Sequence, residues 1–382
     1  MTLLEQFQLW LGSIWPEWAA YITPAIIGIV VVLGFVLTTV IVFIYLERRL
    51  LGRFQIRTGP NRLGPEGIFQ PIATALKVLL KEDIVPAKAD KVVHWLAPVI
   101  VFAPILLIFA VVPFGKGAIF TDLNVGIVYV VAISSLSTVG IYMAGWASSN
   151  KYALIAALRA VAQMVSYELP VILSILGVVL MVGSLSMNQI VESQSIPFIL
   201  LQPLGFVIFF LGTVAEMNRC PFDLLEADSE IVAGYHTEYS GMKFALFYLG
   251  EYGHAVAYSG IIATLFLGGW QGPLLPPIIW FLIKIVAVFC FIVWMRATLP
   301  RLRVDQLMAF AWKCLLPLAV INLFIIAAEV LWLPESMPWI MVVLNFAFAG
   351  VLILLWSKLF TLGGGNNGPC QPPRKRVAMI PE

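Results

Sequence analysis

Charged residues are scarce in this 382-residue chain, where they make up only 12% of the sequence. Hydrophobic residues make up 61%, and the mean hydropathy is +0.95. A soluble domain carries about a quarter charged residues, so this composition excludes an ordinary soluble protein. Several apolar runs exceed the roughly 18–20 residues that cross a bilayer, and the short alternating segments of a transmembrane β-barrel are lacking. The sequence therefore predicts an all-α, polytopic integral membrane protein.

Cysteine is also scarce, and the cysteines that are present are not grouped. They lie apart, without a C-x-x-C pair or a cluster with histidine: Cys220, Cys290, Cys314 and Cys370. Iron–sulfur clusters and structural zinc sites need grouped ligands, and a disulfide framework needs paired cysteines. The sequence therefore predicts no metal, iron–sulfur cluster or disulfide framework in this chain. Basic residues are absent before the first apolar run, so we expect neither a secretory signal nor a transit peptide.

Nine apolar segments are predicted to span the membrane. They are residues 24–46, 96–113, 125–146, 161–182, 197–215, 244–267, 277–295, 314–333 and 339–356. All but two of the 23 lysines and arginines lie in alternate connections or in the tail, and the exceptions are Lys116 and Lys284. The positive-inside rule makes these connections cytoplasmic, with the N-terminus outside and the C-terminus cytoplasmic. We expect a single membrane domain over residues 1–360 and a flexible basic tail over 361–382.

The first cytoplasmic connection, residues 47–95, combines a turn-rich segment with an amphipathic helix. Two Gly-Pro pairs and Gly67 favour turns, and the glycine spacing does not match a nucleotide-binding loop, so we expect no FMN here. An amphipathic helix on the membrane surface is predicted over residues 66–82. Its apolar stripe is Ile68, Ile72, Ala75, Leu76, Leu79 and Leu80. Such a helix beside a break in the backbone can form a portal for an amphiphilic ligand, and packing against another subunit is the alternative.

The connection over residues 216–243 is unusually acidic. It holds six of the 21 acidic residues of the chain, namely Glu216, Asp223, Glu226, Asp228, Glu230 and Glu238. Neighbouring carboxylates resist ionising together, so this loop is a candidate for handling protons. The alternative is a solvated loop that contacts nothing. Arg296, Arg301 and Arg303 in a later connection are expected either to balance these charges or to anchor the membrane surface.

Several ionisable residues fall inside or at the ends of the predicted spans. Glu168, Glu216 and Glu251 lie in the cytoplasmic halves of three spans, which suggests a line of protonatable sites, because charge at membrane depth faces protein or water. Arg219 follows Glu216 by one helical turn and is expected to clamp it. Polar pairing between helices is the structural alternative for each carboxylate, and His254 is interpreted as a packing residue.

A series of motifs carries a resemblance to a known family. In order they are Leu46-Glu-Arg-Arg49, Gly59-Pro-Asn-Arg-Leu-Gly64, Lys77-x3-Lys-Glu82, Lys151-Tyr-Ala-Leu154, Ser166-Tyr-Glu168, residues 215–241, Glu251-Tyr252 and Arg296-x-Thr-Leu-Pro-Arg-Leu-Arg303. Over about residues 22–330 the chain resembles the H-subunit family of proton-translocating NADH:quinone oxidoreductase, the bacterial respiratory complex I. The mitochondrial counterpart of that family is NADH dehydrogenase subunit one.

The resemblance implies the roles of individual residues. It implies a quinone-binding wall of Glu47, Arg48, Arg57, Gly59, Pro60, Asn61, Arg62, Phe222, Asp223 and Arg296. It implies a proton-coupling set of Glu168, Glu216, Arg219, Glu226, Asp228, Glu230, Glu238 and Glu251. Two departures stand out. Thr74 occupies a position where many members carry an aspartate of the quinone pocket, and Asp228 replaces a common glutamate, which keeps the charge but shortens its reach.

The resemblance also implies the setting in which the chain works. It implies a subunit without redox centres, in the bacterial cytoplasmic (inner) membrane, with quinone (ubiquinone or menaquinone) as substrate and electrons arriving from an iron–sulfur cluster of a neighbouring subunit. The implied partners are peripheral-arm subunits, small and antiporter-like membrane subunits and the lipid bilayer, and no nucleic acid. Two alternatives remain open at this stage: the membrane subunit of an energy-converting hydrogenase, and a proton-coupled transporter. A purely structural anchor fits least well, because so many charges lie at membrane depth.

Overall fold

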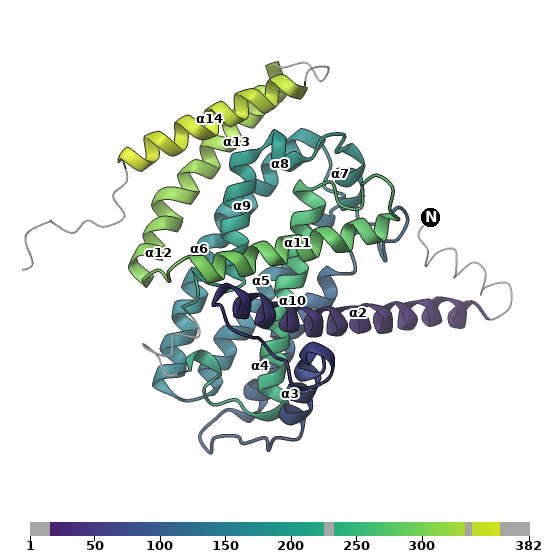
Figure 1. Ribbon diagram of the computed structural model, residues 1–382, viewed down its shortest axis with the longest axis vertical. Coiled ribbons are helices and arrows are strands. Elements are labelled where there is room, and N and C mark those ends of the chain that lie inside the picture. The colour runs from purple at the N-terminus through teal and green to yellow at the C-terminus, as the bar shows by residue number, and fades with distance from the viewer. Residues whose placement is uncertain (1–15, 225–232, 333–337, 360–382) are drawn as a thin grey trace, which may run out of the picture.

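The computed structural model describes residues 16–224, 233–332 and 338–359, and it is a bundle of helices (Figure 1). These residues contain no β-strand and only one isolated bridge, between Gly115 and Ala118. Most exposed side chains over residues 22–42 are apolar, with Ile29 65% and Val30 62% exposed, as expected of a surface that faces hydrocarbon. The prediction of an all-α polytopic membrane protein is confirmed. The predicted tail over 361–382 lies outside the described residues.

Thirteen α-helices make up the described part of the chain. They are α2 (Glu17–Phe54), α3 (Gln70–Leu79), α4 (Lys91–Ile108), α5 (Gly126–Ala147), α6 (Lys151–Val182), α7 (Met187–Ser193), α8 (Phe198–Leu201), α9 (Pro203–Glu216), α10 (Gly241–Phe266), α11 (Pro277–Thr298), α12 (Val304–Phe310), α13 (Leu316–Trp332) and α14 (Pro338–Leu359). A π-helical turn over Ala311–Leu315 joins α12 to α13.

Seven helical stretches within the described residues are long and apolar enough to cross a membrane. They are Ile22–Phe54, Lys91–Ile108, Gly126–Ala147, Lys151–Val182, Pro277–Thr298, Val304–Trp332 and Trp339–Trp356. The other two predicted spans correspond to α9, which has only 14 residues, and α10, which carries Glu251 and His254 among its apolar residues. The count of nine spans and their orientation stay predictions.

Helix boundaries differ from the predicted spans for identifiable local reasons. The fourth span was expected to begin near residue 161, but α6 begins at Lys151 because the Asn150 side chain accepts a hydrogen bond from the Tyr152 amide, as an N-cap does. The fifth is broken at Gln202, after which Pro203 starts α9. The Gln202 amide bonds to the carbonyl of Gly177, at 3.0 Å, so the break is held by α6.

The turn-rich segment before the surface helix has the expected irregular backbone. Gly64 and Gly67 adopt left-handed φ angles of +73° and +78°, and a Cβ on Gly67 would lie 2.4 Å from the carbonyl oxygen of Pro60. This close approach needs glycine. The surface helix itself was predicted over residues 66–82 but occupies only Gln70–Leu79, since the left-handed Gly67 prevents an earlier start.

α10 is the central helix of the bundle. Every residue from Tyr252 to Phe266 is buried, and Figure 1 shows α2 and α11 running across it. Small residues allow the neighbouring helices to approach closely, as is common where helices pack in a membrane. A Cβ on Gly253 of α10 would lie 2.9 Å from Ile105 of α4, and one on Gly145 of α5 would lie 2.3 Å from Ala157 of α6.

The packing of α5 on α6 gives a first prediction. Gly145→Ala places a methyl group 2.3 Å from the Ala157 Cβ and 2.8 Å from the Ala153 carbonyl oxygen, so the two helices must separate. Overpacking of this kind costs about 1–3 kcal/mol. Thermal unfolding of the detergent-solubilised protein should therefore shift to lower temperature. Gly34→Ala is the control, because Gly34 is exposed on α2 with no atom within 4 Å of its Cβ position. Equal unfolding temperatures for the two variants would contradict this account of the interface.

Candidate functional site

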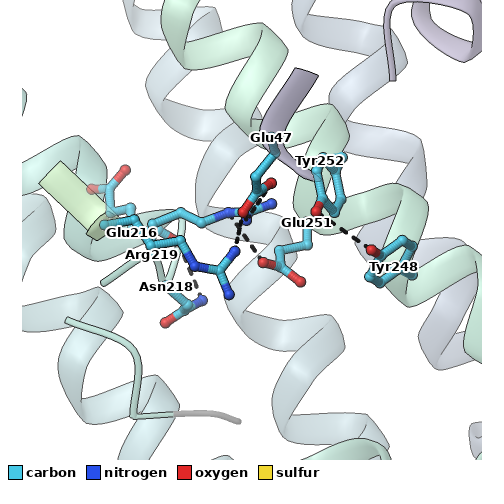
Figure 2. A network of polar contacts seen from close by, with 8 residues as sticks. Glu47, Glu216, Asn218, Arg219, Tyr248, Glu251 and Tyr252 are labelled. Atoms are coloured by element: carbon cyan, nitrogen blue, oxygen red, sulfur yellow. Dashed lines mark hydrogen bonds and ion pairs between the residues drawn. The ribbon is translucent and has the colours of Figure 1, made fainter. Parts of the chain in front are cut away.

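Four charged side chains from four separate elements meet at one buried point. Glu47 comes from α2, Arg219 from the turn after α9, Glu251 from α10 and Arg296 from α11. One terminal nitrogen of Arg219 donates to both carboxylate oxygens of Glu47, at 3.0 and 3.1 Å, and its Nε lies 3.1 Å from a Glu251 oxygen. Arg296 also bonds to Glu47. Figure 2 shows the side chains of Glu47, Arg219 and Glu251 converging, and together with Arg296 we call them the charge quartet.

The local fold after α9 explains how Arg219 reaches this point. Asn218 adopts a left-handed φ of +54°, and the amides of Asn218 and Arg219 bond back to the carbonyls of Ala215 and Val214. This is the Schellman arrangement that ends helices, and asparagine tolerates its left-handed position. Gln163 of α6 holds the turn from outside, since its amide nitrogen donates to the carbonyls of Ala215 (2.8 Å) and Phe222 (2.9 Å).

Two members of the charge quartet are almost completely shielded from solvent, whereas Glu251 and Arg296 are partly exposed. Glu47 is 2% exposed and Arg219 is 4% exposed. The Arg219 guanidinium also lies 4.3 Å from the centre of the Tyr252 ring, a favourable cation–π contact. Burial by itself would lower the pKa of Arg219, but the charges of Glu251 and Glu47 raise it well above its usual value. Arginine therefore stays charged here, and the quartet is formally neutral with two acids and two bases.

Glu216 is not clamped by Arg219, contrary to the expectation from their spacing. The helix ends at Glu216, so Arg219 does not lie one turn further along the same face. The Glu216 carboxylate instead accepts a hydrogen bond from the hydroxyl of Tyr258 on α10. Figure 2 shows the Glu216 carboxyl pointing away from the contact between Glu47 and Arg219. The prediction was wrong because it assumed a continuous helix through residue 219.

Two small cavities adjoin the carboxylates Glu251, Glu216 and Glu168. The larger, about 40 Å³, is bordered by both Glu216 and Glu251. The smaller, about 10 Å³, is bordered by Glu168 of α6, Glu216 and Tyr258. A water molecule needs roughly 10–15 Å³, so the larger cavity has room for a few waters and the smaller for about one. Glu216 borders both cavities and so stands between Glu251 and Glu168.

Apart from Glu47, the predicted quinone-wall residues in the first connection lie outside this cluster. Arg57, Asn61 and Arg62 are exposed, and Arg48, Gly59 and Pro60 are half-buried. Their neighbours fix the segment to the end of α2, because Arg49 bonds to the Tyr45 hydroxyl and pairs with Glu66 at 2.5 Å. On α2, therefore, Glu47 points into the protein whereas Arg49 reaches the surface segment.

Residues of the acidic loop separate into different environments. Phe222 is a core residue whose ring centre lies 5.4 Å from that of Tyr167, and Asp223 is half-buried. Glu238 accepts a hydrogen bond from Asn150 at 2.7 Å and does not join the charge quartet. Arg296 bonds to Glu47 and thereby balances the charge of this carboxylate of α2. The predicted sites Glu226, Asp228 and Glu230 lie outside the described residues.

The sequence interpretation missed several polar residues of the site. Tyr252 and Tyr258 belong to the same helix as Glu251, and Tyr258 is seven residues further on, so helical periodicity could have placed it on the same face. Gln163 gave no comparable signal, because its partners lie 52 and 59 residues away and are backbone carbonyls. In the described part of the chain, no group of three or more His, Cys, Asp or Glu side chains is arranged to hold a metal ion.

Comparison with known proteins places the chain in a family. A family model described as NADH dehydrogenase matches residues 27–327. The chain is 59% identical to the NADH-quinone oxidoreductase H-subunit of Dehalococcoides mccartyi (strain CBDB1) over 341 residues, which cover 89% of this chain and 97% of that protein. It is 49% identical to an H-subunit of the same enzyme from Syntrophobacter fumaroxidans, over 83% of this chain and 99% of the relative. It is 46% identical to the H-subunit of Brevibacillus brevis, over 86% and 97%.

The charge quartet gives a second prediction. Arg219→Gln leaves the buried Glu47 and Glu251 without a shared counter-charge, and breaking a buried ion pair typically costs about 3–5 kcal/mol. We expect a large fall in the thermal unfolding temperature of the solubilised protein. Arg49→Gln is the matched control, since its partner Glu66 is exposed and surface pairs contribute about 0–1 kcal/mol. An Arg219 variant as stable as the Arg49 variant would show that the quartet does not hold the bundle together.

Proposed function

The chain belongs to the NADH dehydrogenase family as a membrane subunit of NADH-quinone oxidoreductase, and we propose that in this complex it forms part of the quinone-binding tunnel and couples quinone reduction to proton translocation. One observation carries the proposal. The charge quartet, Glu216 and Glu168 are joined in turn by two small cavities, from the end of α2 into the membrane domain. Charge at membrane depth normally serves such pathways.

The quinone side of the proposal rests on the first connection and α3. Apolar side chains on α3, among them Ile72, Leu76 and Leu79, are exposed, and α3 follows directly in sequence on the segment that holds the half-buried Pro60 and its exposed arginines. An amphiphilic quinone would enter here from the bilayer. Two electrons from an iron–sulfur subunit, together with two protons, convert the quinone into a quinol. Arg48 and Arg57 would hold the negative charge that develops before those protons arrive.

The coupling side rests on the position of Glu47. This carboxylate lies on the inner face of α2, near the C-terminal end of that helix. Arg49, two residues later, faces the surface segment. Negative charge on the quinone would weaken the hold of Arg296 and Arg219 on Glu47 and Glu251. Glu251 would then take up a proton. Water in the larger cavity would pass this proton to Glu216, and water in the smaller cavity would pass it on from Glu216 to Glu168. Each carboxyl returns to its starting state once it has passed a proton on.

The proposed function also implies a membrane location and partner subunits. The subunit would reside in the bacterial cytoplasmic membrane, bind the peripheral arm through its cytoplasmic connections and contact small and antiporter-like membrane subunits. A proton-coupled transporter would work alone, whereas this chain should copurify with soluble redox subunits. The membrane subunit of an energy-converting hydrogenase would not bind a quinone.

Substitution of the buried carboxylates tests the coupling. Glu216→Gln and Glu251→Gln preserve shape and remove the exchangeable proton, so the complex should assemble but its quinone-dependent NADH oxidation and proton pumping should fall at least about tenfold, since acid–base groups typically contribute ~10²–10⁴-fold. NADH oxidation by a water-soluble artificial acceptor should persist and reports assembly. Glu192→Gln, on the exposed face of α7, is the control. Near-normal pumping by either buried variant would remove that residue from the pathway.

Photolabelling tests the quinone site. A photoreactive quinone analogue bound to the complex in membranes should label residues 57–62 or α3, and excess quinone should suppress the labelling. Labelling of α14, whose exposed apolar face serves as an internal control for lipid-dissolved probe, should not be suppressed. Competitive labelling confined to other helices would contradict the proposed location.

A further inference from the structure

His254 lies between the two carboxylates that the larger cavity joins. It follows Glu251 by three residues and precedes Tyr258 by four, within the continuous helix α10. Residues at this spacing lie on one face of a helix. Glu251 belongs to the charge quartet, and Tyr258 donates to Glu216. His254 therefore stands on the same stripe of α10, midway between the quartet and Glu216, and its ring centre is 6.2 Å from that of Tyr258.

The imidazole of His254 is buried and is poorly satisfied by the protein around it. The residue is 8% exposed, and neither ring nitrogen makes a hydrogen bond of normal geometry with the described residues. The backbone of Val101 is close enough for a weak hydrogen-bonding contact with the ring. A buried polar group without a good partner costs about 1–3 kcal/mol. His254 borders the 40 Å³ cavity, so water in that cavity can bond to the imidazole.

Other polar groups face the same cavity and define its two ends. Asn218, His236, Tyr248 and Glu251 are half-buried, whereas Glu216 and His254 are buried. Tyr235 also borders it. The cavity is thus shallow beside the quartet and deep beside His254 and Glu216.

We propose that His254 is a proton-relay residue of this cavity, which passes protons by way of water between Glu251 and Glu216. The proposal rests on the proton-coupling function proposed above. A neutral imidazole accepts a proton from water at one ring nitrogen and releases the proton of the other nitrogen to the water beyond. A ring rotation or a return proton restores the original tautomer, so the residue is unchanged by each cycle. The chain uses histidine here because it can accept and donate at once.

The other buried histidine shows what a packing histidine looks like in the same fold. His94 is fully buried and, like His254, makes no hydrogen bond of normal geometry at either ring nitrogen with the described residues, but its ring stacks on that of Tyr239 with a centroid distance of 4.0 Å and an interplanar angle of 6°. It borders neither of the two cavities beside the carboxylates. His94 accordingly serves as the matched control for substitutions of His254.

Two substitutions separate relay from packing. His254→Leu removes the polar ring, whereas His254→Gln still bonds to water but cannot transfer a proton through itself. In the intact complex, a relay predicts that both variants lose quinone-dependent turnover and pumping about tenfold or more. His94→Gln should leave both rates unchanged, and the artificial-acceptor rate reports assembly in every variant. Normal rates with His254→Gln would overturn the proposal, because a hydrogen-bonding or packing role is then sufficient.

Pumping by the Glu216 and His254 variants together distinguishes failure of the relay role from failure of the coupling function. If Glu216→Gln abolishes pumping but both His254 variants pump normally, the relay role fails while the coupling function stands. If Glu216→Gln also pumps normally, the coupling function itself fails. Should the His254 variants not assemble, a high-resolution structure of the wild-type complex decides: ordered water within hydrogen-bond distance of a ring nitrogen supports the relay, and a dry or side-chain-filled cavity overturns it.

Discussion

The buried charge of Arg219 is the constraint on which the arrangement of this bundle depends. A guanidinium cannot release its proton in a protein, so its burial is tolerated only where acids surround it. Glu47 and Glu251 supply those acids from helices that are distant in sequence, and Arg296 balances the surplus. The C-terminal ends of α2 and α11, the middle of α10 and the turn after α9 are therefore held in register by electrostatics. The apolar packing of α10 then excludes the water that would weaken these contacts.

α2 separates two chemical environments across a single helical turn. Glu47 bonds to Arg219 inside the protein, while Arg49 bonds to the backbone of Glu66 in the adjacent exposed Gly-Pro segment. A change of charge beside Arg49 is thus only two residues away from Glu47, the carboxylate to which Arg219 and Arg296 bond. In the proposed function this closeness is what allows quinone chemistry to act on protons without a redox centre in the chain.

The sequence was sufficient for the fold class and for the carboxylates inside the helices, because apolar length and charge at membrane depth are local properties. The partners of those carboxylates were not predictable from spacing. Arg219 was paired with Glu216 on the assumption of a continuous helix, whereas Asn218 ends the helix and turns Arg219 toward residue 47, 172 positions earlier. His254 was interpreted as a packing residue because a lone histidine gives no signal of a cavity; only the fold places it beside one. The surface helix was predicted too long because the left-handed backbone of Gly67 leaves no trace in an apolar stripe.

Gln163 has a mechanical consequence. Its side-chain amide nitrogen donates hydrogen bonds to the carbonyls of Ala215 and Phe222, on both sides of the turn that carries Arg219. Glu168 lies five residues further along the same helix, α6. A sliding or rotation of α6 would carry the turn with it and alter the distance between Arg219 and its acids. α6 thus carries Glu168 and also holds the turn that positions Arg219. A movement of α6 and a change in the protonation of Glu168 would therefore both be transmitted through the same helix.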